Sequence, residues 1–446
     1  MKKHWLLKLV AMLLAFGLVA AACGDDDDDT STDGGDDSGE ASSLEGTTVT
    51  VTGPERDDAE AGAIQAALDI FAEANGMTIT YTGDADWEAN INTQVEGGNP
   101  PNISIFPQPG KLADFARDGH LVPLNESAAA ATASNWSEAW TAFGNVDGTQ
   151  VGVPVKTDLK SLVWYQPAAF EANGYSVPET FDDFVALVNT MIADGNTPLC
   201  VGIESGQATG WTYTDWVEDM MLRTVGADVY DQWVAHDIPF NDDRVVDAMQ
   251  QVLDLWNTEG AVFASGGSIA ATAFQDNGGP LVDGDCMMHR QASFYAAFFP
   301  EGTAFADGSD AAVDVFYFPS INGDRPVLGA GTLAAGFDDS PETMAVLEYM
   351  STADYAEARQ TAQVDLKGGG LSGFLSAANG QDLGVYADLE QSFINILATA
   401  EVVRFDASDL MPADVGAGTF WTEGTAAVNG DITAQEAADN IEASWP

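Results

Sequence analysis

Acidic, amide and aromatic side chains follow three stretches of sequence that are typical of buried strands. These side chains are Glu55 after Thr47–Gly53, Asp84, Asp86 and Trp87 after Met77–Tyr81, and Gln108 after Ile103–Phe106. Ligands of parallel sheets bind beyond the carboxyl ends of the strands, so we expect these residues to line one site. Carboxylates and amides bond to hydroxyl groups, and a Trp ring covers an apolar face. The pattern therefore predicts non-covalent binding of a small polar molecule.

The sequence lacks the common motifs of catalysis and cofactor binding. Its four histidines, His4, His120, His236 and His289, form neither His-Glu-x-x-His nor a zinc site with a Cys pair. There is no Gly-x-Ser-x-Gly elbow and no phosphate-binding Gly-x4-Gly-Lys-Ser/Thr loop. Residues 329–334 match the loose dinucleotide fingerprint, but they do not open a strand–turn–helix unit. We expect no cofactor, no metal and no enzymatic activity.

The elements that must position these residues alternate between strand and helix. Apolar spacing predicts helices over 58–74, 86–96 and 111–117, each following one of the three strands. Such alternation indicates a parallel sheet covered by helices on both faces. It resumes from Leu162–Tyr165 onward, with helices predicted over 181–194, 214–225, 245–257, 342–350 and 385–400. The chain is therefore predicted to form two α/β lobes. Asp84 has a second interpretation, as a cap of the helix that begins near Asp86.

Charge excludes several classes of partner. The chain carries 70 Asp and Glu against 15 Lys and Arg, a net charge of −55. This surface repels nucleic acid phosphates and anionic lipid, so we expect neither as a direct partner.

The N-terminus is typical of an exported lipoprotein. Lys2 and Lys3 precede the apolar run Trp5–Ala22, which fits a signal peptide over residues 1–22. Its end, Ala20-Ala21-Ala22-Cys23, resembles a bacterial lipobox, in which Cys23 is diacylated and becomes the first residue. Residues 23–45 are rich in Asp, Gly and Ser and are expected to form a disordered tether. The alternative is an uncleaved spanning helix, but Lys8 and the short run disfavour it.

Several segments, in order, carry a resemblance to a known family. They are Gly97–Phe106, Lys111–Gly119 with Leu121–Leu124, Gly152–Val155 with Ser161–Tyr165, Pro178–Phe184, and Thr419-Phe420-Trp421. Together they resemble the extracellular solute-binding proteins of sugar importers, the maltose-binding-protein superfamily. Residues 206–222 and 286–294 are most similar to its α-glucoside-binding branch. Gln166 departs from the Asn that is usual in the family.

The resemblance implies a two-lobe periplasmic-binding-protein fold of type II-like architecture, with mainly parallel sheets and a ligand cleft between the lobes. By analogy, the N-lobe takes 46–156 and 319–370, and the C-lobe takes 157–318 and 371–446. The implied function is capture of a sugar, an α-glucoside or oligosaccharide, by hinge closure. The implied partner is the permease of an ABC transporter. We expect a monomer at the outer face of the bacterial cell membrane, which it contacts only through the lipid.

The resemblance also adds candidate site residues. Asp158 lines up with an acidic ligand-binding position of the family, and Trp421 with a sugar-stacking Trp. The remaining candidates are Lys156 beside Asp158, Trp211 and Tyr213 after Gly210, and Arg290 and Gln291 after the Cys286 strand. Arg290 has a second interpretation as a structural ion pair.

The cysteines left after Cys23 are Cys200 and Cys286. In an exported chain they are either a disulfide or two separate buried thiols. The resemblance places both on strands of one lobe and favours the disulfide.

Two alternatives stay open at this stage. A polyol or polyamine is a possible ligand, because an acidic cleft with aromatic rings suits a polyamine. A surface glycoside hydrolase would need two carboxylates about 5–10 Å apart across the cleft.

Overall fold

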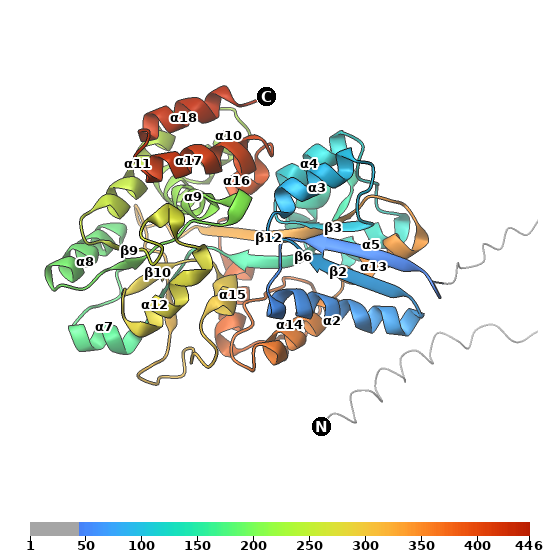
Figure 1. Ribbon diagram of the computed structural model, residues 1–446, viewed down its shortest axis with the longest axis horizontal. Helices are drawn as coiled ribbons and strands as arrows, with labels where there is room; N and C mark the ends of the chain where they lie inside the picture. Colours follow the sequence, from blue (N-terminus) through green and yellow to red (C-terminus); the bar gives the residue numbers. More distant parts are fainter. Residues whose placement is uncertain (1–43) are drawn as a thin grey trace, which may run out of the picture. The chain divides into compact units, whose positions relative to one another are not determined.

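The computed structural model describes residues 44–446, in which two large β-sheets are flanked by helices (Figure 1). A small two-stranded sheet is formed by β4 (Asn145–Val146) and β5 (Thr149–Gln150). The predicted signal peptide, the lipidation site Cys23 and the tether up to residue 43 lie outside the described residues. Within residues 44–446 there is no helix with the length and apolarity that crossing a bilayer requires.

The N-lobe is built on a six-stranded sheet with the order β13-β12-β3-β1-β2, in which β6 also pairs with β12. Its strands are β1 (Thr48–Gly53), β2 (Thr78–Gly83), β3 (Ile103–Phe106), β6 (Gly152–Leu159), β12 (Val327–Gly336) and β13 (Val403–Phe405). The strands β1, β2 and β3 are parallel, as the alternation predicts, whereas β12 runs antiparallel to β3 and β6. The sheet is therefore mixed.

The C-lobe is built on a five-stranded sheet with the order β11-β7-β10-β8-β9. Its strands are β7 (Leu162–Tyr165), β8 (Leu199–Cys200), β9 (Val262–Phe263), β10 (Met288–Arg290) and β11 (Asp314–Tyr317). The predicted disulfide is confirmed: Cys200 and Cys286 are bonded, with Cα atoms 5.5 Å apart. It ties β8 to the residues just before β10.

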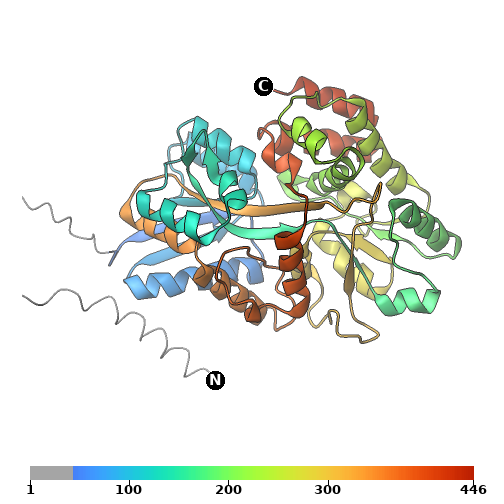
Figure 2. The same cartoon turned by 180° about the vertical axis from the view of Figure 1, so that it is seen from behind.

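Helices cover both sheets. Those of the N-lobe are α2 (Asp58–Asn75), α3 (Trp87–Glu96), α4 (Pro109–Arg117), α5 (Glu126–Asn135), α6 (Glu138–Thr141), α13 (Pro341–Met350) and α14 (Ala353–Leu366). The others are α7 (Pro167–Asn173), α8 (Phe181–Ala193), α9 (Trp211–Val225), α10 (Ala227–Val234), α11 (Asp243–Asn257), α12 (Gly278–Asp283), α15 (Asp388–Thr399), α16 (Ala407–Leu410), α17 (Phe420–Val428) and α18 (Ala434–Ala443). In both views α2 and α14 lie side by side (Figure 1 and Figure 2).

Local chemistry explains the helix that follows β1. The Asp57 carboxylate accepts hydrogen bonds from the N–H groups of Ala59 and Glu60, which begins α2. Gly76 ends the helix with φ of 66°, a left-handed conformation that costs glycine little. Ile64 and Leu68 are fully buried against Val49 and Val51 of β1. The predicted helix 58–74 therefore forms, one residue longer.

Three passages of the chain between the lobes concern the site. β6 ends at Leu159 and β7 begins at Leu162, so Lys160 and Ser161 form the first passage. The second joins β11 to β12, and the third joins β13 to α16. The long strands β12 and β6 lie side by side through the middle of the described unit (Figure 1 and Figure 2). The predicted lobe boundaries themselves stay a prediction.

Candidate ligand-binding site

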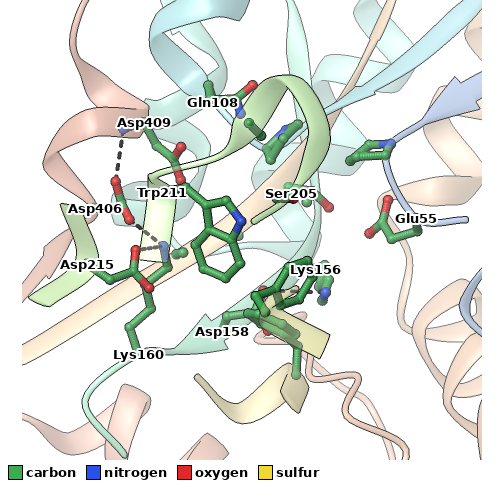
Figure 3. A pocket seen from close by; sticks show the side chains of 18 of the residues that line it. Glu55, Gln108, Lys156, Asp158, Lys160, Ser205, Trp211, Asp215, Asp406 and Asp409 are labelled. Carbon is green, nitrogen blue, oxygen red and sulfur yellow. Dashed lines mark hydrogen bonds and ion pairs between the residues drawn. The ribbon is translucent and has the colours of Figure 1, made fainter. Parts of the chain in front are cut away.

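A cavity of about 540 Å³ lies beyond the carboxyl ends of β1 and β3 (Figure 3). Residues of both lobes and of the first and third passages line it. Its volume falls within the roughly 300–1,000 Å³ of small-molecule sites. Six residues predicted from the sequence line this cavity: Glu55, Gln108, Lys156, Asp158, Trp211 and Trp421.

The other six predicted residues lie elsewhere. Asp84 accepts hydrogen bonds from the Asp86 N–H at 3.0 Å and from Asn90 at 2.6 Å, so it organises the turn before α3. Asp86 precedes α3 and is exposed. Trp87 is buried under the sheet, where its Nε1–H donates to Ser104 at 2.9 Å. These three residues are not part of the cavity wall, because the turn directs them away from it.

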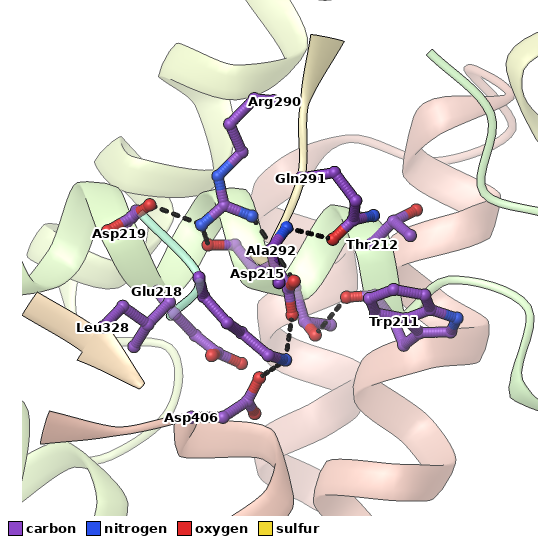
Figure 4. Close-up of polar contacts among 12 residues, drawn as sticks. Trp211, Thr212, Asp215, Glu218, Asp219, Arg290, Gln291, Ala292, Leu328 and Asp406 are labelled. Atoms are coloured by element: carbon purple, nitrogen blue, oxygen red, sulfur yellow. Dashed lines mark hydrogen bonds and ion pairs between the residues drawn. The ribbon is translucent and has the colours of Figure 1, made fainter. Parts of the chain in front are cut away.

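Tyr213, Arg290 and Gln291 are buried in the C-lobe outside the cavity wall. The Tyr213 hydroxyl donates to the Met249 carbonyl at 3.3 Å. The side-chain oxygen of Gln291 accepts from the Ala292 N–H at 2.8 Å. Arg290 pairs with Asp215 and Asp219 (Figure 4), which agrees with its second interpretation as a structural ion pair.

Aromatic rings form one wall of the cavity. Trp211 begins α9, and its ring meets Phe274 edge-on at 5.0 Å between centroids and Phe294 at 5.9 Å. Phe298 and Trp421 add to the lining. Figure 3 shows the Trp211 ring projecting between Gln108 on one side and Lys156 with Asp158 on the other. Such rings can cover the apolar faces of a ligand.

A loose charge cluster occupies one end of the cavity. Lys156 Nζ lies 3.6 Å from Asp158 Oδ2 and 4.0 Å from Glu60 Oε1. Nearby, Arg359 donates to Glu55 Oε1 at 3.2 Å. Burial raises the pKa of Asp158 to about 6, because Lys156 only partly offsets the loss of water. Burial likewise raises the pKa of Glu60. We call Glu55, Glu60, Lys156 and Asp158 the loose cluster.

A tight charge cluster occupies the other end. Lys160 Nζ donates to Asp215 Oδ1 at 2.7 Å and to Asp406 at shorter range (Figure 3). Burial raises the pKa of Asp215 to about 7. Burial also opposes ionisation of Asp406, but the bonded Lys160 outweighs it and holds the pKa of Asp406 below its ordinary value. We call Lys160, Asp215 and Asp406 the tight cluster.

Polar atoms without partners point to where a ligand binds. Five buried atoms of the cavity lining have no hydrogen-bond partner among residues 44–446: Glu55 Oε2, Gln108 Oε1, Asp158 Oδ1, Thr332 Oγ1 and Trp421 Nε1. Buried polar atoms are nearly always bonded, so a group of orphans in one cavity indicates missing partners. Acceptors, a hydroxyl and an indole N–H together suit a molecule with several hydroxyl groups.

Sequence reasoning missed Lys160, Asp215, Thr332, Asp406 and the Phe residues of the wall. A signal existed for Lys160, because Lys156, Asp158 and Lys160 alternate along an extended segment and therefore share one side of it. Asp406 follows β13, a three-residue strand that no sequence pattern predicted. Asp215 is one helical turn after Trp211 and faces the same way.

This fold and cavity define a two-lobe receptor for a small solute. The family described as "Bacterial extracellular solute-binding protein" matches residues 53–357. This match covers more than half of the chain, and the protein belongs to this family.

Two curated relatives match over most of both chains. The chain is 41% identical over 389 residues to the Osmoprotective compounds-binding protein GgtB of Synechocystis sp., covering 86% of this chain and 89% of that one. It is 38% identical over 419 residues to the Alpha-glucosides-binding periplasmic protein AglE of Rhizobium meliloti, covering 90% and 88%.

Solved structures share the fold. A chitin oligosaccharide binding protein superposes with a TM-score of 0.75 at 17% identity, covering 89% of this chain and 98% of that one. The bacterial solute receptor AcbH gives a TM-score of 0.74 at 20% identity, covering 89% and 98%. The protein is thus a sugar- or solute-binding protein of an ABC importer, of the extracellular or periplasmic class, and not an enzyme.

Proposed function

We propose that the protein captures an α-glucoside in the cavity, closes its lobes over it by hinge bending and delivers it to the permease of its ABC transporter. The observation that carries this proposal is the coincidence of five buried orphan polar atoms with an aromatic wall. The hydroxyl groups of a glucoside can bond to these polar atoms, and its C–H faces can pack against the aromatic rings. The name of the relative AglE supports the same ligand class.

The protonation of the cavity supports a neutral ligand over a polyamine. Carboxyl groups outnumber the cations Arg56, Lys156 and Lys160 in the lining, which would favour a cationic ligand if all of them were ionised. Burial, however, raises the pKa of Asp158 to about 6 and that of Asp215 to about 7. Because burial disfavours the charged form of both groups, the lining attracts a cation less strongly than its number of carboxyl groups suggests. A polyol remains the second candidate, because the name of GgtB gives osmoprotective compounds as its ligands.

A thermal-shift screen of the purified protein tests the ligand class. Maltose, trehalose and methyl α-glucoside are compared with sorbitol, glycerol and spermidine, at moderate and high salt. A ligand at about a hundredfold its Kd adds about 2.7 kcal/mol to stability, which raises Tm measurably. We expect shifts with the α-glucosides. If only spermidine or only the polyols raise Tm, the ligand is a polyamine or a polyol and not an α-glucoside. If none of the compounds raises Tm, the proposal is contradicted.

We also propose that Cys23 carries a lipid that anchors the protein to the outer face of the cell membrane. The motif Ala20-Ala21-Ala22-Cys23 after the apolar run supports this. Labelled fatty acid should be incorporated by the wild-type protein and not by Cys23→Ser. Equal labelling of the two would overturn the anchor and leave the ligand proposal untouched.

A further inference from the structure

Helix α9 carries a buried row of charges that only partly belongs to the ligand cavity. Asp215, Asp219 and Arg223 follow one another at intervals of four residues, so they lie along one face of the helix. All three are almost completely buried. Of the three, only Asp215 lines the cavity. Burying charges is costly unless they are paired, so this row has partners that determine its role.

The row contacts the passages between the lobes. Asp215 binds Lys160 of the first passage, and Lys160 also binds Asp406 after β13, in the third. Arg223 Nε donates to the Pro319 carbonyl at 3.3 Å, in the second. Figure 4 shows the ion pair between Arg290 and Asp219, which completes this network.

Ser161, in the first passage, bonds to both α9 and β12. Its hydroxyl donates to Asp219 Oδ1 at 2.8 Å and accepts from the Leu328 N–H of β12 at 3.1 Å. The side chain is fully buried and does not line the cavity. One hydroxyl therefore couples the first passage, the start of β12 and the helix whose first residue is Trp211.

We propose that Ser161 is a positioning residue that sets the hinge between the lobes. The proposal rests on capture of the ligand by lobe closure, as inferred above. Lys160 and Ser161 lie in the first passage and bind α9, and α9 presents Trp211 and Asp215 to the ligand. Without the hydroxyl, the first passage and β12 lose their side-chain link to Asp219 of α9, and only the backbone hydrogen bonds between Lys160 and Leu328 and between Phe318 and Ser161 remain. Asp219 keeps its pairs with Arg223 and Arg290. The closed arrangement is then less populated, and apparent affinity falls with that population.

The test compares Ser161→Ala with Ser351→Ala. Ser351 is equally buried, and its hydroxyl donates to Glu348 O at 2.7 Å, but it touches no passage. Spin labels at Glu73→Cys and Glu259→Cys, both exposed and on different lobes, report the distance between the lobes by pulsed EPR in a Cys23→Ser background. We expect Ser161→Ala to shift or broaden this distance distribution without ligand, while Ser351→Ala matches the parent. Identical distributions for all three proteins would overturn the proposal.

Maltose as the probe gives a second readout. We expect Ser161→Ala to weaken maltose binding about tenfold relative to Ser351→Ala, as for loss of a hydrogen bond to a charged group. Equal affinities in the two variants would contradict the proposal. If maltose binds neither variant nor the parent, the proposed α-glucoside function fails, and the EPR comparison, which needs no ligand, still decides the role of Ser161.

Discussion

The two ends of the cavity differ in how well their charges are satisfied, although each is centred on a lysine of the same short segment. In the tight cluster, Lys160 makes hydrogen bonds to both Asp215 and Asp406. In the loose cluster, Lys156 lies at 3.6 Å and 4.0 Å from its carboxylates. Glu55 Oε2 and Asp158 Oδ1 in that cluster are buried and have no partner among residues 44–446. The comparison separates charges that hold the protein together from charges that await a ligand.

The difference has an energetic reason. A buried pair with ideal geometry repays much of its desolvation cost through its hydrogen bonds, and breaking it is expensive. A buried carboxylate with weak contacts does not recover that cost within the protein, and a ligand that supplies the missing donors recovers part of it on binding. The loose cluster therefore lowers the stability of the ligand-free protein and contributes to affinity when a ligand binds.

Replacing each lysine by methionine tests this comparison with the largest expected effect. Lys160→Met leaves Asp406 buried without its cation and Asp215 with Arg290 alone, and should lower the free energy of unfolding by about 3–5 kcal/mol. Lys156→Met breaks only long contacts and should cost clearly less, while weakening ligand binding. Urea unfolding followed by circular dichroism measures both losses. Equal losses would show that the two clusters do not differ as described.

The pH dependence of stability should have opposite signs for Asp158 of the loose cluster and Asp406 of the tight cluster. The folded pKa of Asp158 is raised to about 6, so the folded state binds the proton more tightly than the unfolded chain. The contribution of Asp158 to stability is therefore present below about pH 4 and is lost as pH rises through 6, by at most about 3 kcal/mol. Asp158→Asn should remove this loss.

Asp406 supplies the matched comparison. Its folded pKa is depressed, so its contribution is present above its unfolded pKa and is lost as pH falls below about 4. Asp406→Asn should therefore flatten only the acid limb of the stability curve, measured by urea unfolding at a series of pH values. If both variants alter the same limb, the assignment of loose and tight carboxylates is wrong.

Sequence pattern alone predicts two cavity residues in the loops of the N-lobe. Glu55 and Gln108 follow strands whose apolar alternation is clear, so their place at the sheet edge is readable. Trp87 and Tyr213 show the limit of this reasoning. Each lies within two residues of a residue that lines the cavity. Successive side chains of a helix differ in direction by about 100°, so the side chains of Trp87 and Tyr213 point into the hydrophobic cores.

Long-range geometry accounts for what the sequence could not predict. Asp406 and Lys160 are 246 residues apart and meet only because β13 joins the sheet beside β12. The sequence does not predict helix α14, because its buried face has no apolar stripe: Arg359 and Gln363 are buried beside Tyr355. Pairing of this kind depends on the whole fold and leaves no local pattern.

The smallest expected effect concerns a single hydroxyl and its neighbour. Thr332 Oγ1 and Thr157 Oγ1 are both buried without partners among residues 44–446, and they lie on the paired strands β12 and β6. Only Thr332 lines the cavity. Thr332→Val should weaken binding of the best α-glucoside from the screen about fivefold, because one hydrogen bond contributes about 1 kcal/mol. Thr157→Val should leave that affinity unchanged by isothermal titration calorimetry.

Because valine matches threonine in shape and neither hydroxyl is bonded in the protein, both variants should fold with little change in stability. A common change in affinity would mean that the substitutions act through the strand pair rather than through contact with the ligand. A loss of affinity confined to Thr332→Val would show that the ligand contacts Thr332 Oγ1, one of the buried polar atoms of the cavity that lack a partner within residues 44–446.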